Sequence, residues 1–191
     1  MSVPRAVLDA DVIFSRVLHE LMGRLAAGVR LFDLVWSEEL LGEAKSSLIE
    51  RKGLIAEVAE TWVGHMRREF PDSCVDISAV PGDLDLGSMT RDPGDVHVCA
   101  LAIASSADLL FTFDRGYLKD PLRDHGVEVP DLDRFLIERC EEQPQAFARI
   151  VEAQAEVWSG GRPLEELLAA FERANVPAFA ATLRPLLGSP G

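Results

Sequence analysis

The chain has 191 residues, 48% of them hydrophobic and 27% charged, and a formal net charge of -13. This composition suits a globular domain with a helical addition and excludes a disordered or fibrous protein. The three cysteines show no C-x-x-C spacing, which argues against a zinc site or a disulfide framework. Asp9 and Asp11 interrupt the first apolar run, and no apolar run is long enough for a bilayer, so we expect a cytoplasmic protein without a signal peptide.

In chain order, the hydrophobic pattern predicts strands that alternate with helices. Ser37 is the expected N-cap of the second helix, and Pro71 ends the third. The predicted strands are 6–8, 31–36, 74–77, 109–113 and 126–129, and the predicted helices between and after them are 14–27, 38–48, 54–70, 96–105 and 132–140, with a loop at 81–94.

This alternation predicts an α/β fold with three layers, α/β/α, around a short and mainly parallel sheet. Three further helices are expected at 147–158, 164–174 and 179–187. We therefore expect one domain over residues 1–140 and a C-terminal helical extension over residues 141–191 that packs on the core or on a second subunit.

Four carboxylates fall where an open parallel sheet binds its ligands, beyond the carboxyl ends of the strands. Asp9 and Asp114 each end a predicted strand, Asp95 begins a helix, and Glu43 lies about two turns into another. Singly, each has an ordinary explanation as a turn, a cap or a solvated position. Together they would crowd like charges, which is costly unless a cation compensates them. Oxygen ligands without His or Cys suit Mg²⁺ or Mn²⁺, and such ions also change the local sign of the field in an acidic protein.

Four segments resemble the motifs of PIN-domain nucleases, in the family order: VLDADVI (7–13), WSEELLGE (36–43), RDPGDVHVCALA (91–102) and ADLLFTFD (107–114). The resemblance covers residues 5–140, and RPLEELL (162–168) is similar to the extension of one branch of VapC-like proteins. It implies a PIN-like fold, a metal-dependent endoribonuclease, and the toxin role in a bacterial type II toxin–antitoxin system. The implied partners are an RNA substrate, a cognate antitoxin and a second copy of the chain.

By the same resemblance, the catalytic and metal-binding acids are Asp9, Glu43, Asp95 and Asp114. Thr112 would be a supporting hydroxyl that orients a ligand or a water. Asp11 stands where the family often has Asn, so it is either an additional ligand or a hydrogen-bonding support. Asp92 competes with Asp95 for the third role, and the spacing of the residues that follow favours Asp95.

Other titratable residues near these motifs have simpler interpretations. We interpret His97 as a helix-face residue rather than a catalytic base. Arg91, Arg115 and Lys119 are among the basic residues that flank the motifs, and they either steer RNA or are ordinary surface charges.

Two alternatives stay open. In the first, Asp9-Ala10-Asp11 begins a haloacid-dehalogenase-like phosphatase with Asp9 as its covalent nucleophile. The sequence lacks the later Lys and paired-acid motif of that class, and Glu43 would have no role. In the second, the chain is a non-catalytic PIN-like protein that only binds a partner.

Overall fold

The computed structural model describes residues 2–158 and 163–188. Helices make up 66% of the structure and strands 8%. The chain divides into two compact units: unit 1 comprises residues 1–14 and 31–129, and unit 2 comprises residues 15–30 and 130–191. Within the described ranges, no helix has the length and apolar character needed to cross a membrane.

The sheet of unit 1 has three parallel strands in the order β2-β1-β3. They are β1 (Arg5–Leu8), β2 (Asp33–Val35) and β3 (Leu109–Phe111). Val7 of the central strand is paired with β2 on one side and with β3 on the other. The apolar residues of β1 are fully buried, as a continuous apolar run in a central parallel strand predicts.

The expected three-layer α/β/α fold is wrong, because the structure is mostly helical and its sheet is smaller than a PIN-like central sheet. The predicted strands at 74–77 and 126–129 each contribute one isolated bridge, to Trp36 and Leu109 respectively. In the first, the Asp76 carboxylate accepts a hydrogen bond from the Ser78 amide (2.8 Å) and starts a 3-10 turn. A side chain that bonds the local backbone in this way competes with strand pairing.

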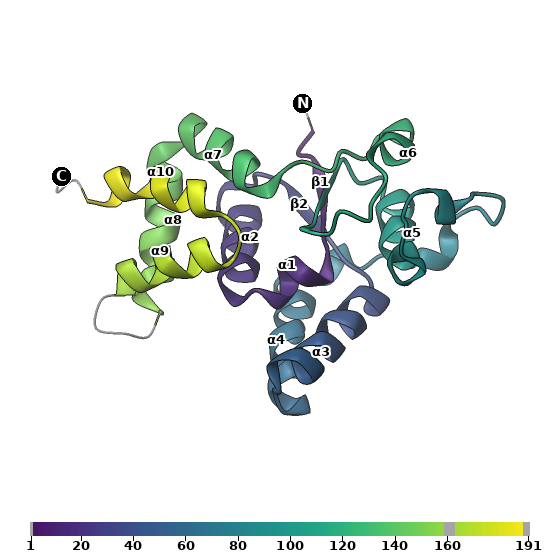
Figure 1. Cartoon of the computed structure of the whole chain (residues 1–191), viewed down its shortest axis with the longest axis horizontal. Coiled ribbons are helices and arrows are strands. Elements are labelled where there is room, and N and C mark those ends of the chain that lie inside the picture. The colour runs from purple at the N-terminus through teal and green to yellow at the C-terminus, as the bar shows by residue number, and fades with distance from the viewer. Residues whose placement is uncertain (1, 159–162, 189–191) are drawn as a thin grey trace. The chain divides into compact units, whose positions relative to one another are not determined.

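Helices surround the sheet of unit 1, and α3 begins where the sequence predicts, with Ser37 accepting a hydrogen bond from the Leu40 amide. Helices α3 and α4 pack on one another as a hairpin (Figure 1). The helices are α1 (Ala10–Phe14), α3 (Glu38–Lys52), α4 (Ala56–Glu69), α5 (Val96–Ala104) and α6 (Lys119–Asp124), with 3-10 turns η1 (Pro71–Ser73), η2 (Ile77–Ala79), η3 (Leu86–Ser88) and η4 (Pro93–Asp95).

Unit 2 is helical. Its core includes Phe147, Phe171 and Phe179, and the ring of Phe179 meets the other two edge-on at centroid distances of 6.0 and 5.4 Å. The expected boundary lay at residue 140, whereas α2 and α7 group with the C-terminal helices. Arg162, the first residue of the VapC-like segment, lies outside the described residues. The helices are α2 (Arg16–Val29), α7 (Leu132–Glu142), α8 (Pro144–Glu156), α9 (Pro163–Arg173) and α10 (Pro177–Leu187).

Candidate functional site

Asp9 directly follows β1, and its backbone amide donates to the Phe111 carbonyl of β3 (2.9 Å). Its side chain is only 5% exposed. One carboxylate oxygen accepts from the Ala10 amide (2.7 Å), and the other accepts from the Thr112 hydroxyl (2.7 Å) and the Tyr117 hydroxyl (3.1 Å). Burial raises the pKa of Asp9, and these donors partly oppose that shift. Asp9 is thus a buried carboxylate in a fixed orientation.

The Thr112 hydroxyl links two of the acids. It donates to Asp9 and accepts from the backbone amide of Asp114 (2.9 Å). The Asp114 carboxylate in turn accepts from the Gly116 amide (2.6 Å). A Cβ atom added to Gly116 would lie 3.0 Å from Asp114 Oδ1 and 3.8 Å from Asp95 Oδ2. Asp114 and Asp95 therefore flank the same glycine, and a larger residue there would press against a carboxylate.

Asp95 ends η4 and immediately precedes α5. Burial first, and then the negative charge of Asp9, raise the pKa of Asp95 to about 6. Asp92 has a local role instead, because its carboxylate accepts from the Gly94 amide (2.8 Å) and caps η4. Of the two candidates for the third acid, Asp95 is the one whose side chain does not cap its own turn.

Asp11 lies on α1, and only one of its two carboxylate oxygens accepts a hydrogen bond. Its Oδ2 accepts from the Phe113 amide (2.9 Å), whereas its Oδ1 is buried without a hydrogen-bond partner. Burial, followed by the charge of Asp9, raises the pKa of Asp11 to about 7. A buried carboxylate oxygen without a donor is costly, and a bound cation would remove that cost.

Glu43, on α3, contacts His97, on α5. Glu43 Oε2 lies 3.1 Å from His97 Nε2, and His97 Nδ1 donates to the Gly94 carbonyl (2.7 Å). Both atoms of the Glu43–His97 contact are buried and lack a well-aligned hydrogen bond, so we treat it as a charge contact. This contact is the main cause of the raised pKa of His97. His97 is thus part of the site, which the interpretation as a plain helix-face residue did not foresee.

The structure brings these carboxylates into one electrostatic group, here called the acid cluster (Asp9, Asp11, Glu43, Asp95 and Asp114). The charge of Asp9 raises the pKa of both Asp11 and Asp95, and that of Glu43 raises the pKa of Asp9. Among the described residues, however, no three or more His, Cys, Asp or Glu side chains are arranged so that they could hold a metal ion. The donor chemistry fits a hard divalent cation, although the side chains as they lie in the structure do not enclose one.

Sequence reasoning missed two contributors to the site. Tyr117 reaches Asp9 from 108 positions away in the sequence, and no local pattern indicates this contact. For His97, the signal is its place two residues after Asp95, within the first turn of α5.

Comparisons with family models, curated proteins and solved structures find no match to this chain. The interpretation of the acid cluster therefore depends on its own geometry and on the resemblance of the four motifs.

Proposed function

We propose that the acid cluster is the active site of a Mg²⁺- or Mn²⁺-dependent endoribonuclease. The observation that supports this most strongly is the crowding of several carboxylates around the buried Asp9, with the pKa of Asp11 raised to about 7 and that of Asp95 to about 6. Crowding of like charges lowers stability unless a cation is bound. The motif resemblance supplies the reaction, cleavage of RNA phosphodiester bonds.

The residues that would hold the ion are Asp9, Glu43, Asp95 and Asp114. When bound, a divalent ion supplies Lewis-acid stabilisation of the phosphate and a more acidic water for hydrolysis. Asp9 is already fixed by three donors and provides a rigid anchor. Thr112 holds the Asp114 backbone next to that anchor. The Glu43 side chain is 39% exposed, which leaves it room to turn toward a ligand.

The first experiment measures Mn²⁺ binding by calorimetry and Mn²⁺-dependent cleavage of single-stranded RNA by the purified full chain. Asp9→Asn removes the anchor's charge, and we expect it to lower the cleavage rate on the order of 100-fold or more. Asp83→Asn is the matched control, because Asp83 is an exposed loop acid whose side chain forms no hydrogen bond or ion pair with the described residues. The control should leave both cleavage and Mn²⁺ binding unchanged.

Equal cleavage by the wild type and Asp9→Asn would remove the proposal. Failure of the wild type to bind Mn²⁺ would do the same. Hydrolysis of p-nitrophenyl phosphate with a trapped phosphoaspartate on Asp9, in place of RNA cleavage, would point to the phosphatase alternative. Mn²⁺ binding without any cleavage would favour a non-catalytic binding protein.

The toxin role, the antitoxin partner and the homodimer are parts of the proposal supported only by the motif resemblance. They predict that expression of the chain arrests bacterial growth and that Asp9→Asn does not. Normal growth with abundant, catalytically active wild-type protein would contradict the toxin role while leaving the nuclease proposal intact.

A further inference from the structure

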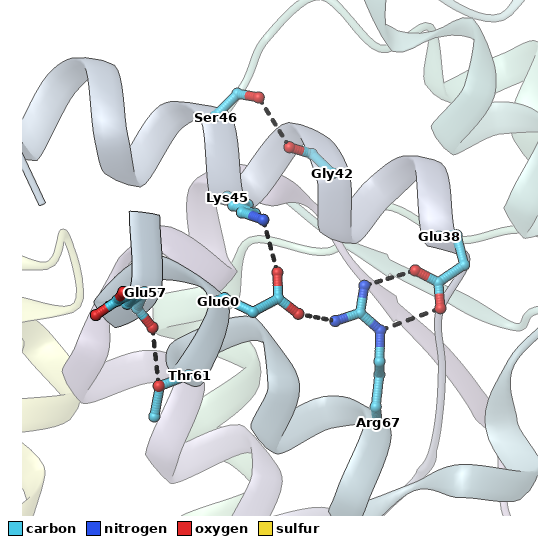
Figure 2. A network of polar contacts seen from close by, with 8 residues as sticks. All are labelled: Glu38, Gly42, Lys45, Ser46, Glu57, Glu60, Thr61 and Arg67. Carbon is cyan, nitrogen blue, oxygen red and sulfur yellow. Dashed lines mark hydrogen bonds and ion pairs between the residues drawn. The ribbon is translucent and has the colours of Figure 1, made fainter. Parts of the chain in front are cut away.

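The Lys and Arg side chains of unit 1 fall into two groups, those that bind a partner and those that do not. On the α3–α4 hairpin, the Arg67 guanidinium binds both Glu38 (2.6 Å) and Glu60 (2.7 Å), and Lys45 binds Glu60 from the other side (2.7 Å), as Figure 2 shows. The other partnered cations of this unit bind a carbonyl, a ring, a histidine or an acid: Arg5, Arg51, Lys52, Arg68 and Arg123. Among the described residues of unit 1, the remaining cations, Arg91, Arg115 and Lys119, have exposed side chains that form no ion pair or hydrogen bond.

These three residues, here called the cationic rim, lie on two segments whose side chains contact Asp9 and Asp95 of the acid cluster. The Arg91 amide donates to the Gly116 carbonyl (3.0 Å), and the Leu118 amide donates to the Met89 carbonyl (2.8 Å), so the segments run side by side. Between these bonds, Thr90 and Tyr117 form a bridge.

The same bridge pair ties the rim to the acids. The Tyr117 hydroxyl donates to Asp9, and the Thr90 hydroxyl lies 3.4 Å from Asp95 Oδ2. Both side chains are buried. The cationic rim is therefore connected to the acid cluster through two short paired segments.

We infer that the cationic rim binds the phosphates of a single-stranded polynucleotide beside the acid cluster. This inference rests on the proposed function, because it names the substrate class of that site. A chain with a net charge of -13 repels a polyanion at long range, so binding requires local cations that are not already paired. Arginines in ion pairs, such as Arg67, are already engaged, whereas the rim residues are free to bind phosphate.

Salt dependence tests this directly, because each phosphate bound on a single strand contributes about 0.7 to the slope of log affinity against log salt. Binding of a fluorescent 20-nucleotide RNA is measured by anisotropy in Mn²⁺, in the Asp9→Asn background to prevent cleavage. We expect the double substitution Arg91→Gln and Arg115→Gln to weaken binding about tenfold or more and to reduce the slope by about 0.7 for each phosphate that is no longer neutralised. The double substitution Arg51→Gln and Arg68→Gln is the control matched in charge, because it removes two exposed positive charges of α3 and α4 that have no acid partner.

The inference would be overturned if the rim variant bound RNA with the same affinity and salt slope as the Arg51→Gln and Arg68→Gln control. The melting temperatures of both variants show whether they are folded. Poly-glutamate that competes for the same arginines as strongly as RNA would also overturn it and would indicate an acidic protein partner. If the rim variant binds RNA more weakly but the wild type does not cleave RNA, the nuclease proposal is wrong and the inference about the rim is supported. If the wild type cleaves RNA and the rim variant binds it with unchanged affinity, only the inference is wrong.

Discussion

Replacing Thr112 with valine should destabilise the protein far more than replacing it with serine. Thr112 is 7% exposed, and its hydroxyl makes two bonds at once, to the Asp9 carboxylate and from the Asp114 amide. Valine has nearly the same shape but neither donates nor accepts. Serine keeps the hydroxyl and loses only the methyl group.

The expected magnitudes follow from these two hydrogen bonds. A hydrogen bond to an ionised group contributes about 1.5–3 kcal/mol, and a neutral one about 1 kcal/mol, so Thr112→Val should lower the free energy of unfolding by about 2.5–4 kcal/mol. Thr112→Ser should cost about 0.8 kcal/mol, the value of one buried methyl group. Loss of the hydroxyl also raises the pKa of Asp9 further, since the Thr112 bond holds it down. A raised carboxyl pKa in the folded state makes stability fall as pH rises, so the gap between the variants should be wider at pH 8 than at pH 5.

Urea unfolding of both variants in EDTA, followed by circular dichroism at each pH, measures these differences. The reasoning is refuted if Thr112→Val and Thr112→Ser unfold at the same urea concentration at pH 8. A gap that widens toward acidic pH would refute the assignment of the Asp9 carboxylate as the charged acceptor.

In EDTA, the pKa values of Asp11 (about 7) and Asp95 (about 6) lie above the unfolded value of 3.8, so the folded state binds more protons and its melting temperature should fall as pH rises from about 4 to about 7. Asp11→Asn should flatten this profile, and a flat wild-type profile would contradict the prediction. His97→Leu should weaken Mn²⁺ binding about 10–100-fold because it releases Glu43, whereas His97→Gln keeps a donor and should weaken binding less. If calorimetry finds equal Mn²⁺ affinities for the two variants, His97 does not position Glu43. Asp133 accepts hydrogen bonds from the first two backbone amides of α10 (3.0 and 2.7 Å). Asp133→Ala should therefore lower the free energy of unfolding by about 1–2 kcal/mol, and Asp133→Asn should lower it less. Equal thermal stability of the two variants would exclude a capping role.

Local signals predicted the start and type of the long helices but not the extent of the sheet. Residues 126–129 illustrate why. Val127 and Val129 are buried, as their apolar character predicts, yet this segment pairs with β3 only around Glu128. A short apolar run determines burial, whereas a strand also needs a neighbour with a free edge over several residues, and that neighbour is distant in sequence. The sequence therefore suggested more strands than the structure contains.

At the site, the sequence located residues at the ends of strands but could not foresee their side-chain partners. Pairing of β1 with β3 confirms that Asp9 and the segment leading to Asp114 follow neighbouring strands, while the catalytic roles of these acids stay predictions. The predicted elements leave a gap between the strand at 6–8 and the helix at 14–27. In the structure, the Asp9 carbonyl accepts bonds from the Val12 and Ile13 amides, and α1 begins at once. This turn places Asp11 beside Asp9, where it becomes a second crowded carboxylate.

The distribution of positive charge in unit 1 favours an external cation at the acid cluster over a purely structural role. A buried carboxylate that serves only structure is normally paired with a cation or satisfied by donors at both oxygens. Here Arg115 adjoins Asp114 in sequence without pairing to it, and Asp11 Oδ1 has no donor. Among the described residues, the one basic side chain in contact with a carboxylate of the cluster is His97, which is charged only when protonated. Elsewhere in this unit Lys45, Arg67 and Arg123 do form ion pairs with acids, whereas no Lys or Arg among the described residues pairs with the acid cluster. A divalent ion at the acid cluster would lower the raised carboxyl pKa values together, so Mn²⁺ should raise the melting temperature more at pH 8 than at pH 5.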